Sequence, residues 1–139
     1  MVLLSPAAEQ ETISSDDGSR INGILSELLS LSGAETALLV RTEGSLVAQA
    51  PKVETHELEC LGMLSGLICG AAQAIASSLG TSLSYVHQHG DKKDLLLLRI
   101  NKTFGLVIAF QQKLGLGGIL YNARRSAVAL GQILESGML

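Results

Sequence analysis

The residues of this sequence with the most obvious chemical potential are a pair of histidines and two cysteines. His87 and His89 alternate along a β-prone segment, so their imidazoles share one strand face and offer two metal ligands. No third ligand of a suitable type is evident near them in sequence, which favours the absence of a metal. Cys60 and Cys69 lie nine positions apart in one apolar segment, a spacing typical of neither a disulfide framework nor a metal site. Neither has the histidine and cationic setting that a catalytic thiolate needs.

Phosphate chemistry has equally little support. The sequence contains no Gly-x-x-x-x-Gly-Lys-Ser/Thr loop. The nearest glycine-rich element, at 113–118, lacks the Gly-x-Gly-x-x-Gly spacing and is predicted to be a strand-to-helix turn. An arginine can supply charge to phosphoryl transfer in trans, but Arg124 and Arg125 lie beside an apolar helical stripe, where a solvated or sheet-capping role is expected. We therefore expect no catalytic site, no cofactor and no metal, and hence a protein that is not itself an enzyme.

The composition indicates which classes of partner and which cell compartment to expect. The formal net charge is −3 and no cluster of Lys and Arg exceeds a pair, so nucleic acid is not expected as a partner. Two reduced thiols and the absence of a signal-peptide pattern at the start predict a cytoplasmic protein. The uncharged stretch 60–80 is long enough to suggest a membrane helix, but it is diluted by polar residues and lacks a cationic flank. We expect no transmembrane segment.

The elements that position these residues belong to one domain, as the length of 139 residues suggests. Residues 1–18 lack apolar periodicity and are expected to form a flexible tail, followed by a domain at 19–136 and a short tail at 137–139. Apolar residues at helical spacing predict a first helix that ends at Gly33, a second at 57–79 and a third at 116–134.

Five short β-prone segments complete the pattern, at 35–41, 45–50, 83–89, 94–100 and 103–110. Their connections are short, so consecutive strands are expected to be antiparallel neighbours. The segments 95–98 and 106–109 are apolar at every position, which predicts that helices cover both faces of the sheet. The expected order is αββαβββα, with the segment 83–89 at an edge.

The second helix, 57–79, carries an apolar face and a face of small residues. Its large apolar residues, including Met63, Leu64 and Leu67, are predicted to pack on the sheet. The opposite face holds glycines at 62, 66 and 70, each of which costs up to about 1 kcal/mol relative to alanine in a helix. Close helix approach in a homodimer explains that cost. The alternative is that these glycines pack under a loop of the same chain.

The expected homodimer interface combines the small face of the second helix with the edge strand that follows it, because a two-fold contact pairs one patch with its own copy. Its predicted residues are Gly62, Ser65, Gly66, Cys69, Gly70, Gln73, Leu83 and Tyr85.

In its ordered features the chain resembles the Roadblock (dynein light chain) family, and within it the bacterial MglB-type proteins. The resemblance covers about residues 19–136. It rests on the element order, on the segments 33–40 and 43–48, on the small-residue central helix and on Val86-His87-Gln88. The segments 116–121 and 124–127 add the same group's C-terminal pattern.

That resemblance implies a single-domain α/β fold, profilin-like, in which the second helix covers one face of a five-stranded antiparallel sheet and the first and third helices cover the other. It implies a homodimer that binds a small Ras-like GTPase of the MglA type, in bacterial cell polarity, and can stimulate its GTP hydrolysis without an inserted arginine. The GTPase is expected across the paired helices, at Glu59, Gln73 and Ser77. A passive dimeric adaptor and a small-ligand sensor are the alternatives.

Overall fold

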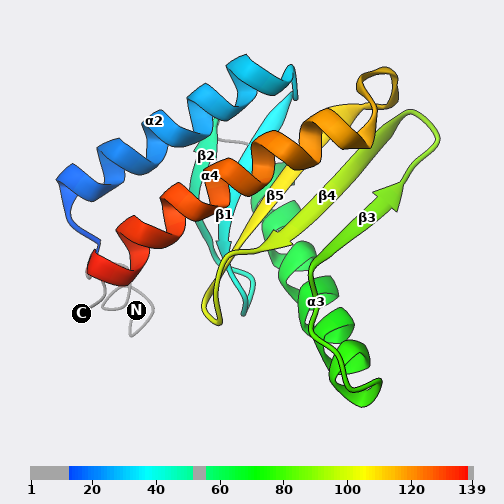
Figure 1. Cartoon of the computed structure of the whole chain (residues 1–139). Helices are drawn as coiled ribbons and strands as arrows, with labels where there is room; N and C mark the ends of the chain where they lie inside the picture. The colour runs from blue at the N-terminus through cyan, green and yellow to red at the C-terminus, as the bar shows by residue number, and fades with distance from the viewer. Residues whose placement is uncertain (1–12, 52–55, 138–139) are drawn as a thin grey trace.

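The computed structural model describes residues 13–51 and 56–137. A five-stranded antiparallel sheet with the strand order β2-β1-β5-β4-β3 lies at its centre. The strands are β1 (Thr36–Arg41), β2 (Leu46–Ala50), β3 (Tyr85–His89), β4 (Lys93–Arg99) and β5 (Phe104–Gln111). The helices are α2 (Ser15–Ser32), α3 (His56–Ser78), the short 3-10 helix η1 (Gln112–Leu114) and α4 (Leu116–Gly137). Figure 1 shows their arrangement.

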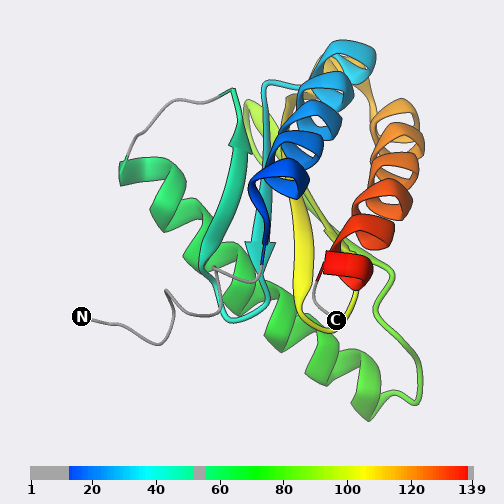
Figure 2. The same ribbon diagram turned by 90° about the vertical axis from the view of Figure 1, so that its left-hand side faces the viewer.

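The three-layer arrangement expected from the sequence is confirmed. In Figure 2, α3 lies on one side of the sheet and α2 and α4 lie together on the other. The larger core fills the space under α2 and α4, and it includes Leu25, Leu96 and Ile108. A smaller core lies under α3, where Leu38, Val40, Leu97 and Val107 are buried. Both faces of β4 and β5 are therefore covered, as their uninterrupted apolar runs predict.

The helix α2 begins at Ser15, four residues before the expected domain start at 19. Ser14 is its N-cap: the backbone is extended there, and the side-chain oxygen accepts a hydrogen bond from the Asp17 amide at 3.1 Å. Asp16 and Asp17 add negative charge to the first turn, where the helix dipole favours it. Residues 15–18 of the predicted tail are therefore helical, and residues 1–12 of it lie outside the described part of the chain.

We expect Ser14→Ala to lower the free energy of unfolding by about 1 kcal/mol, because it removes an acceptor for the first free amides of α2. Urea unfolding followed by circular dichroism measures this difference. Ser26→Ala is the matched control, since Ser26 is exposed in the middle of the same helix and alanine is favoured there. A Ser14 variant as stable as the control would show that the cap contributes nothing.

Candidate protein-protein interface

An apolar surface runs along the side of α3 that faces away from the sheet. We call this surface the outer face of α3; its large side chains are between 55% and 76% exposed. They are Met63, Leu64, Leu67, Ile75 and Leu79. Soluble monomers rarely expose a contiguous apolar patch larger than a few hundred Å², and larger patches commonly bind another protein or a membrane.

The outer face corrects the orientation that the sequence predicted for this helix. Met63, Leu64 and Leu67 were expected to pack on the sheet, but they point outward. Gly62 and Gly66, which were expected to meet a second chain, are buried against the sheet. The prediction was wrong because it assumed that the more hydrophobic side of a helix always faces its own core.

The buried glycines allow α3 to approach the turn between β1 and β2. A Cβ atom on Gly66 would lie 2.6 Å from the Cα of Gly44, and one on Gly62 would lie 3.3 Å from a methyl group of Val40. Ser65, from the same predicted interface, is also fully buried. The alternative interpretation, in which these glycines pack against a loop of the same chain, is therefore the correct one for positions 62 and 66.

Four other residues of the predicted dimer interface line a pocket between α3 and the sheet. Cys69, Gly70, Gln73 and Leu83 line one pocket of about 280 Å³, together with Arg99 and parts of the neighbouring strands. A Cβ atom on Gly70 would meet nothing within 4 Å, so this position is open in the single chain. Burial raises the pKa of the Cys69 thiol, which keeps it protonated and poorly nucleophilic at neutral pH.

Two of the three residues predicted to contact a GTPase are described with their side chains. Gln73 is half-buried, and its Oε1 accepts a hydrogen bond from Arg99 Nη1 at 3.2 Å. Its amide nitrogen donates to the Ser77 hydroxyl at 3.4 Å, and Ser77 is exposed. Gln73 is thus engaged within its own chain, whereas Ser77 is accessible. The Glu59 side chain lies outside the described part of the structure.

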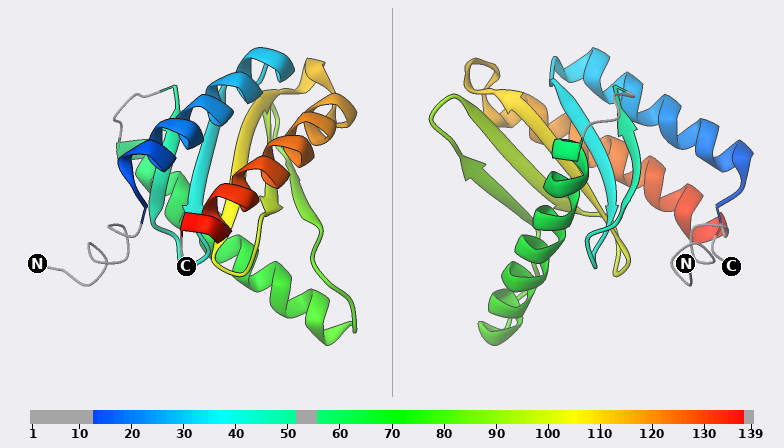
Figure 3. Two further views of the ribbon diagram at one scale, coloured as in Figure 1. Left: turned by 60° about the vertical axis from the view of Figure 1, so that its left-hand side comes forward. Right: turned by 180° about the vertical axis from the view of Figure 1, so that it is seen from behind.

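The end of α3 extends beyond the strands. Figure 3 shows the C-terminal half of this helix projecting past the sheet in both views. Between Ala71 and Ser78, Ala76 alone is buried. By length and composition the stretch Cys60–Ser78 is apolar enough to cross a membrane, and 28% of it is buried within the structure.

β3 forms one edge of the sheet next to this projecting helix, as expected. Its backbone pairs with β4 through the register Tyr85↔Leu98 to His89↔Asp94, and within residues 13–51 and 56–137 no other strand pairs with it. Tyr85 is half-buried at the start of the strand. An unpaired edge of this kind is a template for a strand from another molecule.

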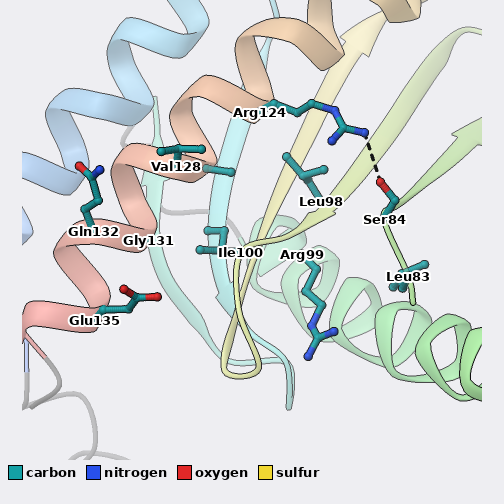
Figure 4. A pocket seen from close by; sticks show the side chains of 11 residues that line it. Leu83, Ser84, Leu98, Arg99, Ile100, Arg124, Val128, Gly131, Gln132 and Glu135 are labelled. Atoms are coloured by element: carbon teal, nitrogen blue, oxygen red, sulfur yellow. Dashed lines mark hydrogen bonds between the residues drawn. The ribbon is translucent and has the colours of Figure 1, made fainter. Parts of the chain in front are cut away.

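The two arginines that sequence analysis weighed for phosphoryl transfer pack on aromatic rings of their own chain. The guanidinium of Arg124 lies 5.8 Å from the centre of the Tyr85 ring, and Nη2 donates to the Ser84 hydroxyl at 3.2 Å. Arg125 lies at the same distance from the Tyr121 ring. Figure 4 shows Arg124 reaching across an open pocket of about 530 Å³ between α4 and the start of β3.

The histidines of β3 meet a carboxylate that sequence reasoning did not associate with them. Asp94 lies directly opposite His89 on β4, and its Oδ2 is 2.7 Å from His87 Nε2. Burial would raise the pKa of Asp94, but hydrogen bonds from His87, His89, Gln112 and the Gly90 amide outweigh it and lower this pKa below its usual value. The pairing register of the β3–β4 hairpin is the signal that could have identified this third group.

Solved structures of other proteins match this chain over most of its length. No protein-family model matches the sequence, and no curated protein matches it significantly. A solved structure described as MglB with a tetrameric arrangement is 26% identical, with a TM-score of 0.81, over 90% of this chain and 95% of that one. The gliding protein MglB from Thermus thermophilus is 25% identical, with a TM-score of 0.80, over 89% and 95% of the two chains.

A more distant match shows that the shared fold is wider than MglB. A Roadblock/LC7 domain from Streptomyces avermitilis is 11% identical, with a TM-score of 0.76, and the alignment covers 82% of this chain and 97% of that domain. The element order, the sheet topology and the placement of α3 opposite α2 and α4 therefore recur across these proteins. This chain therefore has a Roadblock-type fold, and its structure is MglB-like.

Proposed function

We propose that this chain acts as a homodimer that binds a small Ras-like GTPase of the MglA type and stimulates its GTP hydrolysis. The observation that carries the proposal is the outer face of α3, which is large, apolar and exposed in the single chain. Similarity to MglB over nine-tenths of the sequence supports the choice of partner. A cytoplasmic location and a role in cell polarity belong to the same proposal.

In the proposed dimer, the outer face of α3 packs against its own copy and the β3 edges of the two chains pair. Complete burial of a Leu, Ile or Met side chain contributes about 1.5–3 kcal/mol. Several such side chains per copy give a total of the same order as the association cost of about 4–15 kcal/mol. Pairing of the β3 edges adds backbone hydrogen bonds and removes an exposed edge.

An exposed apolar surface can bind either lipid or protein. The arrangement of α3 favours a protein partner. Its inner side packs on the smaller core of the same domain, with Ile68 and Cys69 against Leu38 and Val40. A helix surrounded by lipid cannot keep that contact with a sheet. We therefore expect the chain to purify without detergent, whereas recovery only from a detergent-extracted membrane fraction would reject the dimer proposal.

Stimulation of hydrolysis in this proposal needs no catalytic group from the chain. Arg124 packs on the ring of Tyr85 in β3, and Arg125 packs on the ring of Tyr121 in α4. We therefore do not propose that either arginine inserts into the GTPase site. The dimer would instead hold the catalytic elements of the GTPase in their active arrangement. The exposed hydroxyl of Ser77 lies at the end of α3, and we place the GTPase contact across this part of the paired helices.

The test is phosphate release from a Ras-like GTPase of the MglA type, under excess GTP. We expect the purified chain to accelerate release at least about tenfold. The double variant Arg124→Ala, Arg125→Ala is the control, and its acceleration should be unchanged because loss of an inserted arginine typically costs about 10³–10⁵ in rate. Complex formation with an unchanged rate would reject stimulation and leave the alternative function, a passive dimeric adaptor.

A further inference from the structure

Three metal-ligating side chains meet at the end of the β3–β4 hairpin. They are His87, His89 and Asp94, and one donor atom from each lies within 4.8 Å of the others. Asp94 Oδ2 is 2.7 Å from His87 Nε2 and 3.2 Å from His89 Nδ1. This group is separate from the outer face of α3 and has no part in the proposed GTPase regulation.

The strand register brings these residues to one face of the sheet. His87 and His89 are two positions apart on β3, so their side chains point the same way, and Asp94 stands directly opposite His89. The ring of His87 stacks on Phe110, with 6.2 Å between centroids, and Phe110 belongs to the core under α2 and α4. The cluster therefore lies on the α2–α4 side, and all of its ligands come from one chain.

The Asp94 carboxylate is held in place by groups that are not themselves metal ligands. Its Oδ1 accepts hydrogen bonds from the Gly90 amide at 3.2 Å and from Gln112 Nε2 at 3.1 Å. The Gln112 amide also donates to the Gly90 carbonyl. Asp94 is only 6% exposed, so its orientation is fixed, with Oδ2 toward His87 and both oxygens close to His89 Nδ1, at 3.1 Å for Oδ1 and 3.2 Å for Oδ2. Outer partners of this kind orient the ligands of protein metal sites.

We propose that His87, His89 and Asp94 bind one Zn²⁺ ion per chain, with water as the fourth ligand. Bond lengths of about 2.0–2.2 Å in a tetrahedral zinc site place neighbouring donors about 3.3–3.6 Å apart. The imidazole-to-carboxylate distances here, 2.7 and 3.2 Å, need only small shifts to match that spacing. His89 is 71% exposed at its side chain, which gives an ion and its water a path from solvent.

The competing interpretation is a cluster of hydrogen bonds that closes the hairpin without any ion. In that case the histidines only form hydrogen bonds with Asp94, and added Zn²⁺ does not bind at a defined site. The two interpretations differ in what zinc does to the protein, because a metal must displace the histidine protons from both contacts. A bound ion would also link the edge strand β3 to β4.

The test is a calorimetric titration of ZnCl₂ into the full chain after treatment with a chelator and its removal. We expect saturable uptake of one Zn²⁺ per chain. His89→Ala should weaken the affinity at least about 100-fold, and Gln112→Ala about 10–100-fold, since loss of an outer partner has an effect of that size. Gln88→Ala is the matched control, because Gln88 is exposed on the same strand between the two histidines and should leave the affinity unchanged.

A second measurement separates loss of the site from loss of the fold. Zn²⁺ should shift the imidazole NMR signals of both His87 and His89, and Co²⁺ in its place should give the visible absorption of a four-coordinate ion. His89→Ala should retain the circular dichroism of the parent chain because His89 is exposed. Absence of saturable binding, or equal affinity in the parent and the His89 variant, would overturn the proposal.

Discussion

Leu67→Glu should convert the proposed dimer into a monomer. Leu67 is 63% exposed in the single chain, near the middle of the outer face of α3, so a glutamate there would not disturb the core of the subunit. In the paired state the same carboxylate would be buried against a second apolar surface, where an unpaired charge is strongly disfavoured. We expect the dissociation constant of the dimer to rise at least about 100-fold, which corresponds to about 2.7 kcal/mol.

Sedimentation velocity over a dilution series measures this change. Val128→Glu is the matched control: Val128 is 64% exposed, but it lies on α4, on the opposite side of the sheet. The control should leave the association state of the chain unchanged. If the two variants associate equally well, the outer face of α3 is not the dimer interface.

Gly66→Ala should destabilise the single chain by about 1–3 kcal/mol, the usual range for forcing a methyl group into a packed core. The added Cβ would lie 2.6 Å from Gly44 Cα and 2.8 Å from Gly44 N. These are backbone atoms of the β1–β2 turn, and Gly44 has a φ of +111°, so the turn cannot yield as a flexible side chain would. Either α3 or the turn must shift.

Urea unfolding monitored by circular dichroism tests this effect, with Gly23→Ala as the control. Gly23 is exposed inside α2 and a Cβ there meets nothing within 4 Å. Because alanine is favoured over glycine in a helix by up to about 1 kcal/mol, the control should be slightly more stable than the parent. A Gly66 variant that gains stability like the control would show that α3 does not approach the turn closely.

Most of the fold could be predicted from local patterns in the sequence. Apolar periodicity and short connections indicate the helices, the strands and their antiparallel order, and Gly33 does end α2 with a φ of 80°. The start of α2 is predicted too late because Gly18 and the polar residues beside it are also typical of a tail. The cap at Ser14 shows instead that they form the first turn of the helix.

The orientation of α3 could not be predicted from its own sequence. When a helix packs on a sheet with one side and on another molecule with the other, both sides are apolar and hydrophobicity does not distinguish them. The size of the residues does: Gly62 and Gly66 lie where the sheet and the β1–β2 turn come closest. The larger Leu64 and Leu67 lie on the other side of the helix, where they are 55% and 63% exposed.

The mass of the unmodified chain in solution is the most direct test of self-association. The chain has a mass of 14.5 kDa, so two copies have a combined mass of about 29 kDa. Light scattering on the purified protein at micromolar concentration, without detergent, should give that mass or a multiple of it. A mass of one chain over the whole concentration range would contradict self-association through the outer face of α3.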